Sequence, residues 1–351
     1  MGIKFSLAAV LALVAAAFLG VKAAGLTYFF GVIVPYVALL TFFVGFSYRI
    51  LKWARSPVPF RIPTTSGQQK SFPWIKQNKL DNPSSTAGVI GRMALEVLAF
   101  RSLFKNTKME FRQGPKITYQ WEKWLWLAAL AFHYAFLVII LRHLRFFTEP
   151  VPAFVHGLEL GDGFLQVGLP GLYITDIVFI AAVTYLFIRR VVIPQMRYIS
   201  LPADYFPLFV LLGLGITGVL MRYFTKVDVV SVKELAMGLV SFHPTVPEGI
   251  GVLFFIHLML FSTFIAYFPF SKLMHAGGVF LSPTRNLPND SRIRRHINPW
   301  NYPVPVHTYD EYEDHFRDKM IEVGLPVEKE EAAAEEEEET TTGEHPAPAK
   351  M

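Results

Sequence analysis

The sequence lacks cysteine and is poor in charged residues. None of the 351 residues is Cys, which excludes disulfide bonds, zinc–thiolate sites and iron–sulfur clusters bound by the thiolates of this chain. Only 17% of the residues are charged, against about 25% in an average soluble domain. This shortage disfavours a soluble globular protein, and any metal ion must bind to His or carboxylate ligands.

Apolar residues take the place of the missing charges. Hydrophobic residues make up 52% of the chain and aromatic residues 15%, including 32 Phe, which also argues against disorder. The net charge of +5 does not indicate nucleic-acid binding, because the basic residues fall between apolar runs and form no continuous stripe. The expected surroundings are membrane lipid and protein partners.

Six apolar runs are long enough, or nearly so, to cross a bilayer core that takes about 20 helical residues. They lie at residues 4–22, 26–50, 121–146, 167–189, 204–225 and 248–273. The runs predict an all-α fold, a polytopic transmembrane bundle of about six helices. The first run also resembles a secretory signal, so a retained helix and a cleaved signal both stay open.

Basic residues indicate the orientation, since Lys and Arg accumulate on the cytoplasmic side of a membrane. The segment from Lys52 to Lys123 holds 13 Lys and Arg residues, whereas the connection around Glu149 and Asp162 is acidic. The basic segment is therefore expected inside. The later loops place the C-terminus in the cytoplasm as well, which predicts a multi-pass protein of the inner (cytoplasmic) membrane.

The chain divides into four segments with different compositions. These are two N-terminal transmembrane helices at 1–51, a basic cytoplasmic loop at 52–120, a four-helix core at 121–280 and a cytoplasmic docking segment with an acidic tail at 281–351. Within the basic loop, Ala87–Phe104 has the spacing of an amphipathic helix for the membrane surface or a partner. Beyond Pro326, eight Glu between Glu328 and Glu339 predict disorder.

Four of the ten His residues lie within or at the end of apolar runs: His133, His143, His257 and His275. An imidazole in a bilayer is costly unless it has a partner. The first two are separated by about 15 Å along a helix and the last two by about 27 Å. Two His on each of two antiparallel helices suit two stacked haems, and the topology pairs His143 with His257 and His133 with His275.

Simpler roles for these His residues stay open. Each one alone could make a hydrogen bond to a neighbouring helix, and His243 is a competing ligand, although Pro244 and Pro247 interrupt a helix there. A haem-free membrane anchor accounts for the runs but not for four intramembrane His. A transporter or channel would be expected to show internal repeats, which the sequence lacks. The unequal separations also require a tilt or a low position of His275.

Two stretches identify a family resemblance. Residues Phe254–Leu260 (FFIHLML) and Phe268–His275 (FPFSKLMH) resemble the last helix of the respiratory nitrate reductase gamma subunit, a dihaem cytochrome b. The ten-residue spacing of His133 and His143 extends the resemblance to residues 121–280. It implies that these four His ligate the irons of two haem b groups.

A narrower resemblance lies in the basic loop. Residues 61–70 (RIPTTSGQQK), Pro73–Ile75 and Gly91–Ala94 are similar to the membrane cytochrome b subunit of dissimilatory sulfite reduction complexes, a branch of the same superfamily. This resemblance implies electron exchange between menaquinone and a cytoplasmic iron–sulfur subunit similar to heterodisulfide reductase, with further membrane and periplasmic subunits. A nitrate-reductase-like quinol oxidase subunit is the alternative.

Charged residues near the helix ends suggest further roles. Arg142, Arg145 and Arg222 lie where haem propionates would need cations, although snorkelling to the interface accounts for them equally well. Asp176 is a carboxylate well inside an apolar run, where it could take protons from a quinol or bond to a neighbouring helix. In nitrate reductase relatives a Lys assists the quinol, but this chain has no Lys between Lys123 and Lys226.

Overall fold

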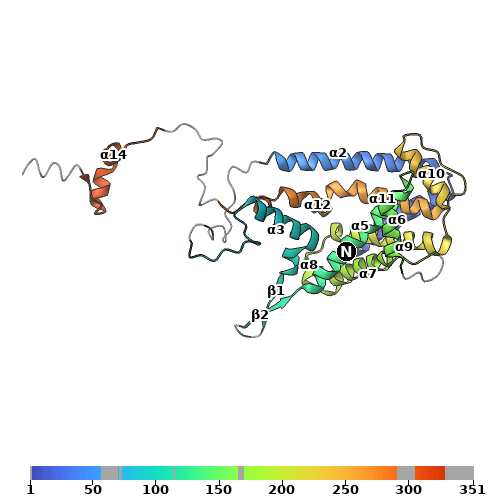
Figure 1. Ribbon diagram of the computed structural model, residues 1–351, viewed down its shortest axis with the longest axis horizontal. Helices are drawn as coiled ribbons and strands as arrows, with labels where there is room; N and C mark the ends of the chain where they lie inside the picture. The colour runs from blue at the N-terminus through green and yellow to red at the C-terminus, as the bar shows by residue number, and fades with distance from the viewer. Residues whose placement is uncertain are drawn as a thin grey trace, which may run out of the picture. The chain divides into compact units, whose positions relative to one another are not determined.

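The apolar runs of the sequence form helices that pack side by side (Figure 1). The computed structural model describes residues 2–56, 70, 73–112, 114, 116–164, 170–290 and 305–328. The chain divides into two units, Met1–His296 and Ile297–Met351. The first unit contains the apolar helices, and the described part of the second contains the helix α14 (Tyr309–Glu322).

Among the described residues, five helices are long and apolar enough to cross a membrane. They are α1 (Gly2–Lys22), α2 (Val34–Ala54) after a π-helical turn at Phe29–Ile33, α5 (Lys123–His143), α9 (Pro202–Val219) with a π-helical turn at Leu220–Thr225, and α11 (Val252–Tyr267). The predicted all-α polytopic bundle is confirmed.

The sixth predicted run, at residues 167–189, forms α7 (Ile174–Val192). This helix begins later than the run and carries Asp176, Arg189 and Arg190, so it is more polar than the other five. It packs between α5 and α9 and therefore belongs to the bundle.

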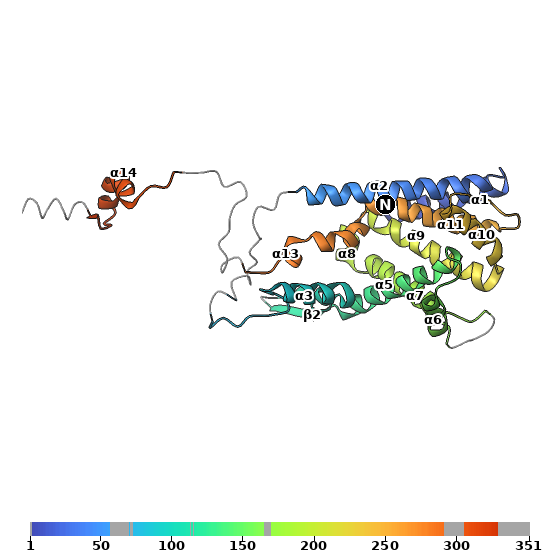
Figure 2. The same ribbon diagram turned by 45° about the horizontal axis from the view of Figure 1, so that its top comes forward.

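The order of packing places α5 and α11 on different sides of α7 and α9. Helix α5 packs on α7, α7 on α9, α9 on both α1 and α11, and α2 on α11. Figure 2 shows these helices running side by side, with α2 and α11 on one side of α9 and α5 and α7 on the other. Helix α5 contacts α11 less closely than it contacts α7, so the two helices that carry the predicted His ligands meet mainly through side chains.

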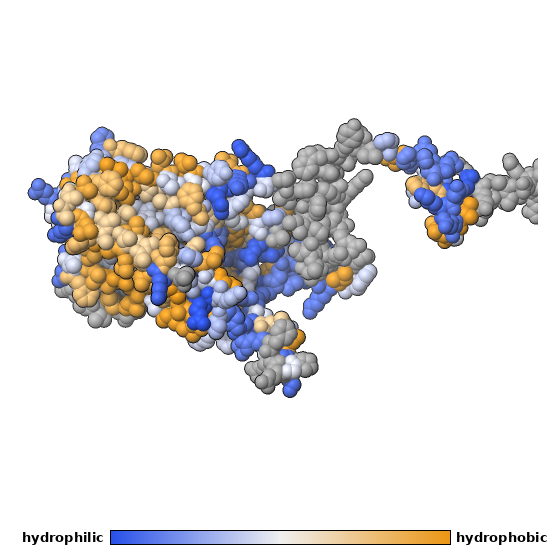
Figure 3. All heavy atoms as spheres, turned by 180° about the vertical axis from the view of Figure 1, so that it is seen from behind, coloured by the Kyte–Doolittle hydropathy of each residue, from blue (hydrophilic) through white to orange (hydrophobic). Residues whose placement is uncertain are grey.

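Rings and branched side chains fill the core of the bundle. Phe179, Val183, Leu211, Phe255 and Leu260 are buried there. The outside is apolar as well: Phe5 is 68% exposed and Leu40 is 66% exposed. Figure 3 shows hydrophobic side chains spread over the face of the bundle, which is the surface expected of helices in contact with lipid.

The amphipathic helix predicted at Ala87–Phe104 is present but interrupted. It forms α3 (Thr86–Ala99) and α4 (Arg101–Phe104), separated by Phe100 in the left-handed conformation with φ 49°. One side of α3 lies on α5, because Trp126 Nε1 donates to the Ala99 carbonyl oxygen at 2.7 Å and the Tyr134 hydroxyl donates to that of Leu98 at 2.9 Å.

A two-stranded hairpin follows α4 and was not predicted. Its strands β1 (Thr107–Arg112) and β2 (Lys116–Trp121) pair antiparallel, with Thr107 opposite Trp121. Gly114 adopts φ 81° between them, a conformation that glycine reaches without strain. The Gly-Pro dipeptide at 114–115 was the available turn signal.

The last apolar run is not one continuous helix. The prediction that His257 and His275 lie on one helix is therefore wrong. Helix α11 ends at Tyr267, a 3-10 turn follows at Phe268–Phe270, and Ser271 is extended, with φ −120° and ψ 178°. A second 3-10 turn at Lys272–Met274 then leads into α12 (His275–Gly278). The chain therefore changes direction before His275, and His257 and His275 do not share a straight helix face.

Short helices complete the described chain. They are α6 (Ala153–Asp162), α8 (Pro194–Ile199), α10 (Val229–Val240) and α13 (Pro283–Asn286). The predicted docking segment contains α14. Thr308 and Glu311 form a reciprocal capping box at the start of this helix. Residues 329–351 of the acidic tail predicted beyond Pro326, and residues 61–69 of the motif at 61–70, lie outside the described residues.

Candidate functional site

The structure places the four predicted His residues in two pairs. His133 lies in the middle of α5 and His143 is its last residue, while His257 lies in α11 and His275 begins α12. The ring centres of His133 and His275 are 6.0 Å apart. His143 lies near enough to His257 for an electrostatic interaction. These are the partners that the topology of the runs assigned.

All four imidazoles use their Nδ1 atoms in hydrogen bonds. The partners are the carbonyl oxygen of Ala129 for His133 (2.7 Å), that of Ile139 for His143 (2.7 Å), that of Lys272 for His275 (2.9 Å) and the hydroxyl of Thr217 for His257 (2.7 Å). Because a carbonyl oxygen only accepts, Nδ1 carries the proton in the first three rings and Nε2 carries the lone pair.

The Thr217 hydroxyl sets the same tautomer in His257. Its Oγ1 atom lies 2.7 Å from the Gly213 carbonyl oxygen, to which it donates its single proton. It can therefore only accept from His257 Nδ1. Histidines that bind a metal usually donate their second N–H in this way, which orients the ring and leaves the other nitrogen as ligand.

This donor set fits haem better than a free metal ion. Among the described residues, no group of three or more His, Cys, Asp or Glu side chains could hold a metal. Two imidazoles and a porphyrin together would complete the coordination of a haem iron. The ring centres of His133 and His275 lie 6.0 Å apart, a separation that two metal–nitrogen bonds of about 2 Å each would fit.

Aromatic rings occupy the level between the two His pairs. Phe136 of α5 contacts Phe264 of α11 with ring centres 5.8 Å apart, and it stacks on Phe179 of α7 at 5.8 Å. Phe136 follows His133 by one helical turn, and Phe264 lies between His257 and His275 in the chain. The bundle therefore separates the two pairs with packed apolar side chains.

A buried polar network lies beside His143, and we call it the Arg142 cluster: Arg142, Asp162, Thr175, Asp176 and Tyr223. Arg142 is 7% exposed and pairs with Asp162 at 3.1 Å and with Asp176 at 2.8 Å. The Tyr223 hydroxyl donates to Asp176 at 2.9 Å. One guanidinium group therefore serves two carboxylates from two different elements, α6 and α7.

The three predicted arginines differ in their partners. Arg142 is held by the two carboxylates of its cluster, and Arg145 pairs with Glu159 at 2.6 Å. Arg222 has no carboxylate partner among the described residues; it donates to the Gly171 carbonyl oxygen at 3.2 Å and lies 3.8 Å from the centre of the Tyr173 ring. Of the three, Arg222 is the cation whose charge is not already neutralised by a neighbour.

The other His pair is His133 and His275. We call the region around it, with Lys272 and Asp204, the Lys272 end. Lys272, whose carbonyl oxygen holds His275, pairs through its ammonium group with Asp204 at 2.6 Å. Asp204 also accepts from the Leu201 N–H at 3.0 Å and so caps α9. The rings of Phe100 and His133 also make a perpendicular contact, with ring centres 4.9 Å apart.

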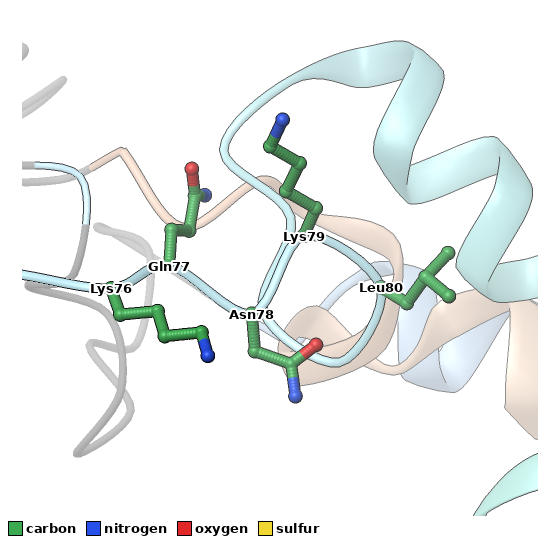
Figure 4. A pocket seen from close by; sticks show the side chains of 5 residues that line it. All are labelled: Lys76, Gln77, Asn78, Lys79 and Leu80. Atoms are coloured by element: carbon green, nitrogen blue, oxygen red, sulfur yellow. The ribbon is translucent and has the colours of Figure 1, made fainter.

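The pocket that Figure 4 shows lies elsewhere. Lys76, Gln77, Asn78, Lys79 and Leu80 line it, in the loop before α3. The side chains of Lys76 and Lys79 point in different directions (Figure 4), and Asn78 donates to Asp81 at 2.7 Å. None of the predicted site residues lines this pocket. The candidate site therefore consists of the two His pairs.

Comparison with known proteins agrees with this geometry. Residues 93–293 match the nitrate reductase gamma subunit family, a range that includes all four His residues. The chain belongs to the nitrate reductase gamma subunit family.

Two relatives of this gamma-family chain carry a more specific name. It is 48% identical over 279 residues to the Hdr-like menaquinol oxidoreductase cytochrome b-like subunit of Archaeoglobus fulgidus, a match that covers 78% of this chain and 83% of the relative. It is 45% identical over 274 residues to the protein of the same name from Archaeoglobus profundus, covering 76% and 81%.

Several residues around the site of this gamma-family chain were not predicted. Thr217 orients His257, Asp204 clamps the turn of His275, and Asp162, Tyr173 and Tyr223 surround the predicted Arg142 and Asp176. A polar residue within an apolar run, such as Thr217, is a weak signal of this kind. Its partner lies 40 residues away, so the sequence alone could not name it.

Proposed function

We propose that this chain is a two-haem b membrane cytochrome that exchanges electrons between menaquinone and a cytoplasmic iron–sulfur partner similar to heterodisulfide reductase. The observation that carries the proposal is the arrangement of four imidazoles in two pairs, with Nδ1 hydrogen-bonded and Nε2 left as ligand. His133 and His275 would hold one haem, and His143 and His257 the other. Bound haem iron would supply one-electron carriers at two levels of the membrane.

The arginines assist unequally in this proposal. Arg222 is the best placed for a haem propionate, since no carboxylate of the described residues neutralises it and a guanidinium binds a carboxylate in a bidentate fashion. Arg142 and Arg145 already pair with carboxylates, which weakens the same assignment for them. Their role here is to fix α5 to α6 and α7.

The partners in the proposal follow from the two relatives and from the sequence resemblance. The relatives are named for menaquinol and for an Hdr-like enzyme, which supports a quinone substrate and a heterodisulfide-reductase-like subunit. The resemblance of the basic loop to sulfite reduction complexes supports a place in sulfite or sulfate respiration, with further membrane and periplasmic subunits. The basic residues favour a cytoplasmic loop and C-terminus in the inner membrane.

A quinol oxidase subunit of the nitrate reductase type is the second candidate, favoured by the family match over residues 93–293. The two candidates share the haem and quinol chemistry and differ in the electron acceptor.

The test of the proposed function is electron delivery in the purified complex. Reduced menadione, a soluble naphthoquinol, should reduce haem b, and the iron–sulfur partner should then reoxidise it. Reoxidation by the heterodisulfide-reductase-like subunit supports the first candidate, whereas reoxidation only by a nitrate reductase catalytic subunit supports the second. Failure of the quinol to reduce any haem would contradict both.

A further inference from the structure

Asp176 in the Arg142 cluster does not cap the helix in whose first turn it lies. It lies in the first turn of α7, but another carboxylate caps that helix: Asp162 accepts from the Thr175 N–H at 2.8 Å and from the Thr175 hydroxyl at 2.5 Å. Asp176 instead accepts from Arg142 at 2.8 Å and from the Tyr223 phenol at 2.9 Å. A carboxylate within a membrane span is costly and marks a proton or substrate path.

The cluster contains two carboxylates and one guanidinium group. Arg142 contributes one positive charge, and Asp162 and Asp176 contribute two negative charges, so the triad carries a net charge of −1. A second guanidinium group, that of Arg222, lies 3.8 Å from the centre of the Tyr173 ring, as that of Arg142 also does.

Ionisable groups lead from the cluster towards solvent. Asp162, Glu159 and His156 follow one another at three-residue spacing on α6, so that each lies beside the next. Glu159 pairs with Arg145 at 2.6 Å and lies 3.8 Å from His156, whose side chain is 57% exposed.

The corresponding carboxylate at the Lys272 end, Asp204, has different partners. Asp204 uses one oxygen to cap α9 and the other to bind Lys272. It therefore clamps a turn, whereas Asp176 faces a phenol that can pass on a proton.

We propose that Asp176 is the proton acceptor for quinol oxidation, with Tyr223 beside it, and that Asp162, Glu159 and His156 carry the proton to the aqueous surface. This inference rests on the proposed function, which supplies the electron acceptor, the haem held by the adjacent pair His143 and His257.

The step balances as follows for one quinol. One quinol O–H bond breaks as one O–H bond forms on the Asp176 carboxylate, which then loses the proton along α6 and accepts the second one. Each haem iron would take one electron: the haem held by His143 and His257 would accept the first electron, pass it to the haem held by His133 and His275, and then accept the second, as the quinol is oxidised to quinone.

The experiment measures how fast reduced menadione reduces haem in the purified full-length protein. Asp176→Asn keeps the volume; its amide oxygen can still accept from Arg142 and its NH2 group can donate to the Tyr223 oxygen, but it cannot take a proton. We expect haem reduction to be about 100-fold slower or more, since general bases contribute about 10²–10⁴-fold. Haem content and the dithionite-reduced spectrum should be unchanged, and Asp176→Glu should restore part of the rate.

The pH profile separates a proton acceptor from a structural residue. Without the carboxylate, the quinol must ionise in solution first, so the Asn variant should speed up with rising pH more steeply than the wild type does. A purely structural role would lower the rate at every pH by the same factor.

Glu122→Gln is the matched control. Glu122 and Arg189 pair at 3.1 Å and join α5 to α7, the same two helices that Arg142 and Asp176 join, but they contact none of the four His residues. The control should keep the wild-type rate.

The outcomes separate the two proposals. A wild-type rate in Asp176→Asn, equal slowing in Asp176→Asn and Glu122→Gln, or loss of haem from Asp176→Asn would each overturn the role of Asp176 and leave the proposed function standing. A wild-type protein whose haem the quinol does not reduce would overturn the proposed function itself.

Discussion

The two His pairs are built in different ways. At the Arg142 cluster, His143 and His257 both belong to regular helices, α5 and α11, and a buried ion-pair network lies beside His143. At the Lys272 end, His133 also lies in a regular helix, but His275 lies after a break in the chain at Ser271. Contacts from distant elements hold that turn.

Because the two His pairs are held by different contacts, different substitutions should disturb each pair. The orientation of the His257 ring is set by Thr217 of α9. The position of His275 is set by the preceding turn, which packs against α2 and forms an ion pair with α9. Gly45 of α2 lies against Pro269, where an added Cβ would come within 2.8 Å, and Asp204 of α9 binds Lys272. Four predictions test this contrast.

Removal of one imidazole should have the largest effect. His257→Ala should lose one haem and keep the haem at His133 and His275, and His275→Ala should do the reverse, because each pair would hold its own haem. Haem quantified per chain and redox titration of the remaining haem check this. Loss of both haems from either variant, in a protein that still folds, would contradict two independent pairs.

Thr217→Val should weaken only the haem at His257. The substitution keeps the shape and removes the hydroxyl that accepts from Nδ1. Loss of such a partner typically costs about 10–100-fold in metal affinity. Haem retention during dilution measures the effect, and Thr217→Ser, which retains the hydroxyl, is the control. Equal haem loss from both variants would show that the hydroxyl does not matter.

Gly45→Val should disturb the opposite end. The added side chain meets Pro269, and an overpacked site typically costs about 1–3 kcal/mol. Because Pro269 begins the turn that leads to His275, the spectrum or potential of the haem at His133 and His275 should change, together with lower thermal stability in detergent. Gly91→Val, where the structure leaves open space around an added Cβ, should change neither.

Asp204→Asn should have the smallest effect and should act at the Lys272 end alone. The variant loses the charge that binds Lys272 and keeps a side chain able to cap α9. Because Lys272 is 75% exposed, the lost ion pair is screened by solvent and is worth about 1 kcal/mol at most. A shifted potential for one haem, with the other unchanged, is the expected readout; equal shifts in both would contradict a local clamp.

Much of the fold follows from composition and run length. The apolar runs gave the helices because a bilayer requires about 20 apolar residues per crossing, and the charges of α7 explain why that helix stands apart. The hairpin at 107–121 and the helix α14 were missed, since neither belongs to an apolar run. The break at Ser271 was also missed, because that run stays uncharged up to the Ser and only Pro269 signals the change.

Only those site residues whose side chains are costly to place in a bilayer could be predicted from the sequence. An imidazole in an apolar run stands out from the sequence, so His133, His143, His257 and His275 could be named. Tyr223 and Asp162 could not, because phenols and carboxylates near helix ends are common and only tertiary packing shows that both lie around Asp176 and Arg142.

The central claim is that each His pair holds one haem b. The most direct measurement is a dithionite-reduced minus oxidised spectrum of the purified membrane protein, with haem quantified per chain. The account predicts a b-type spectrum and two haems per chain. A well-folded preparation with no haem, or with a single haem that survives substitution of either pair, would contradict it.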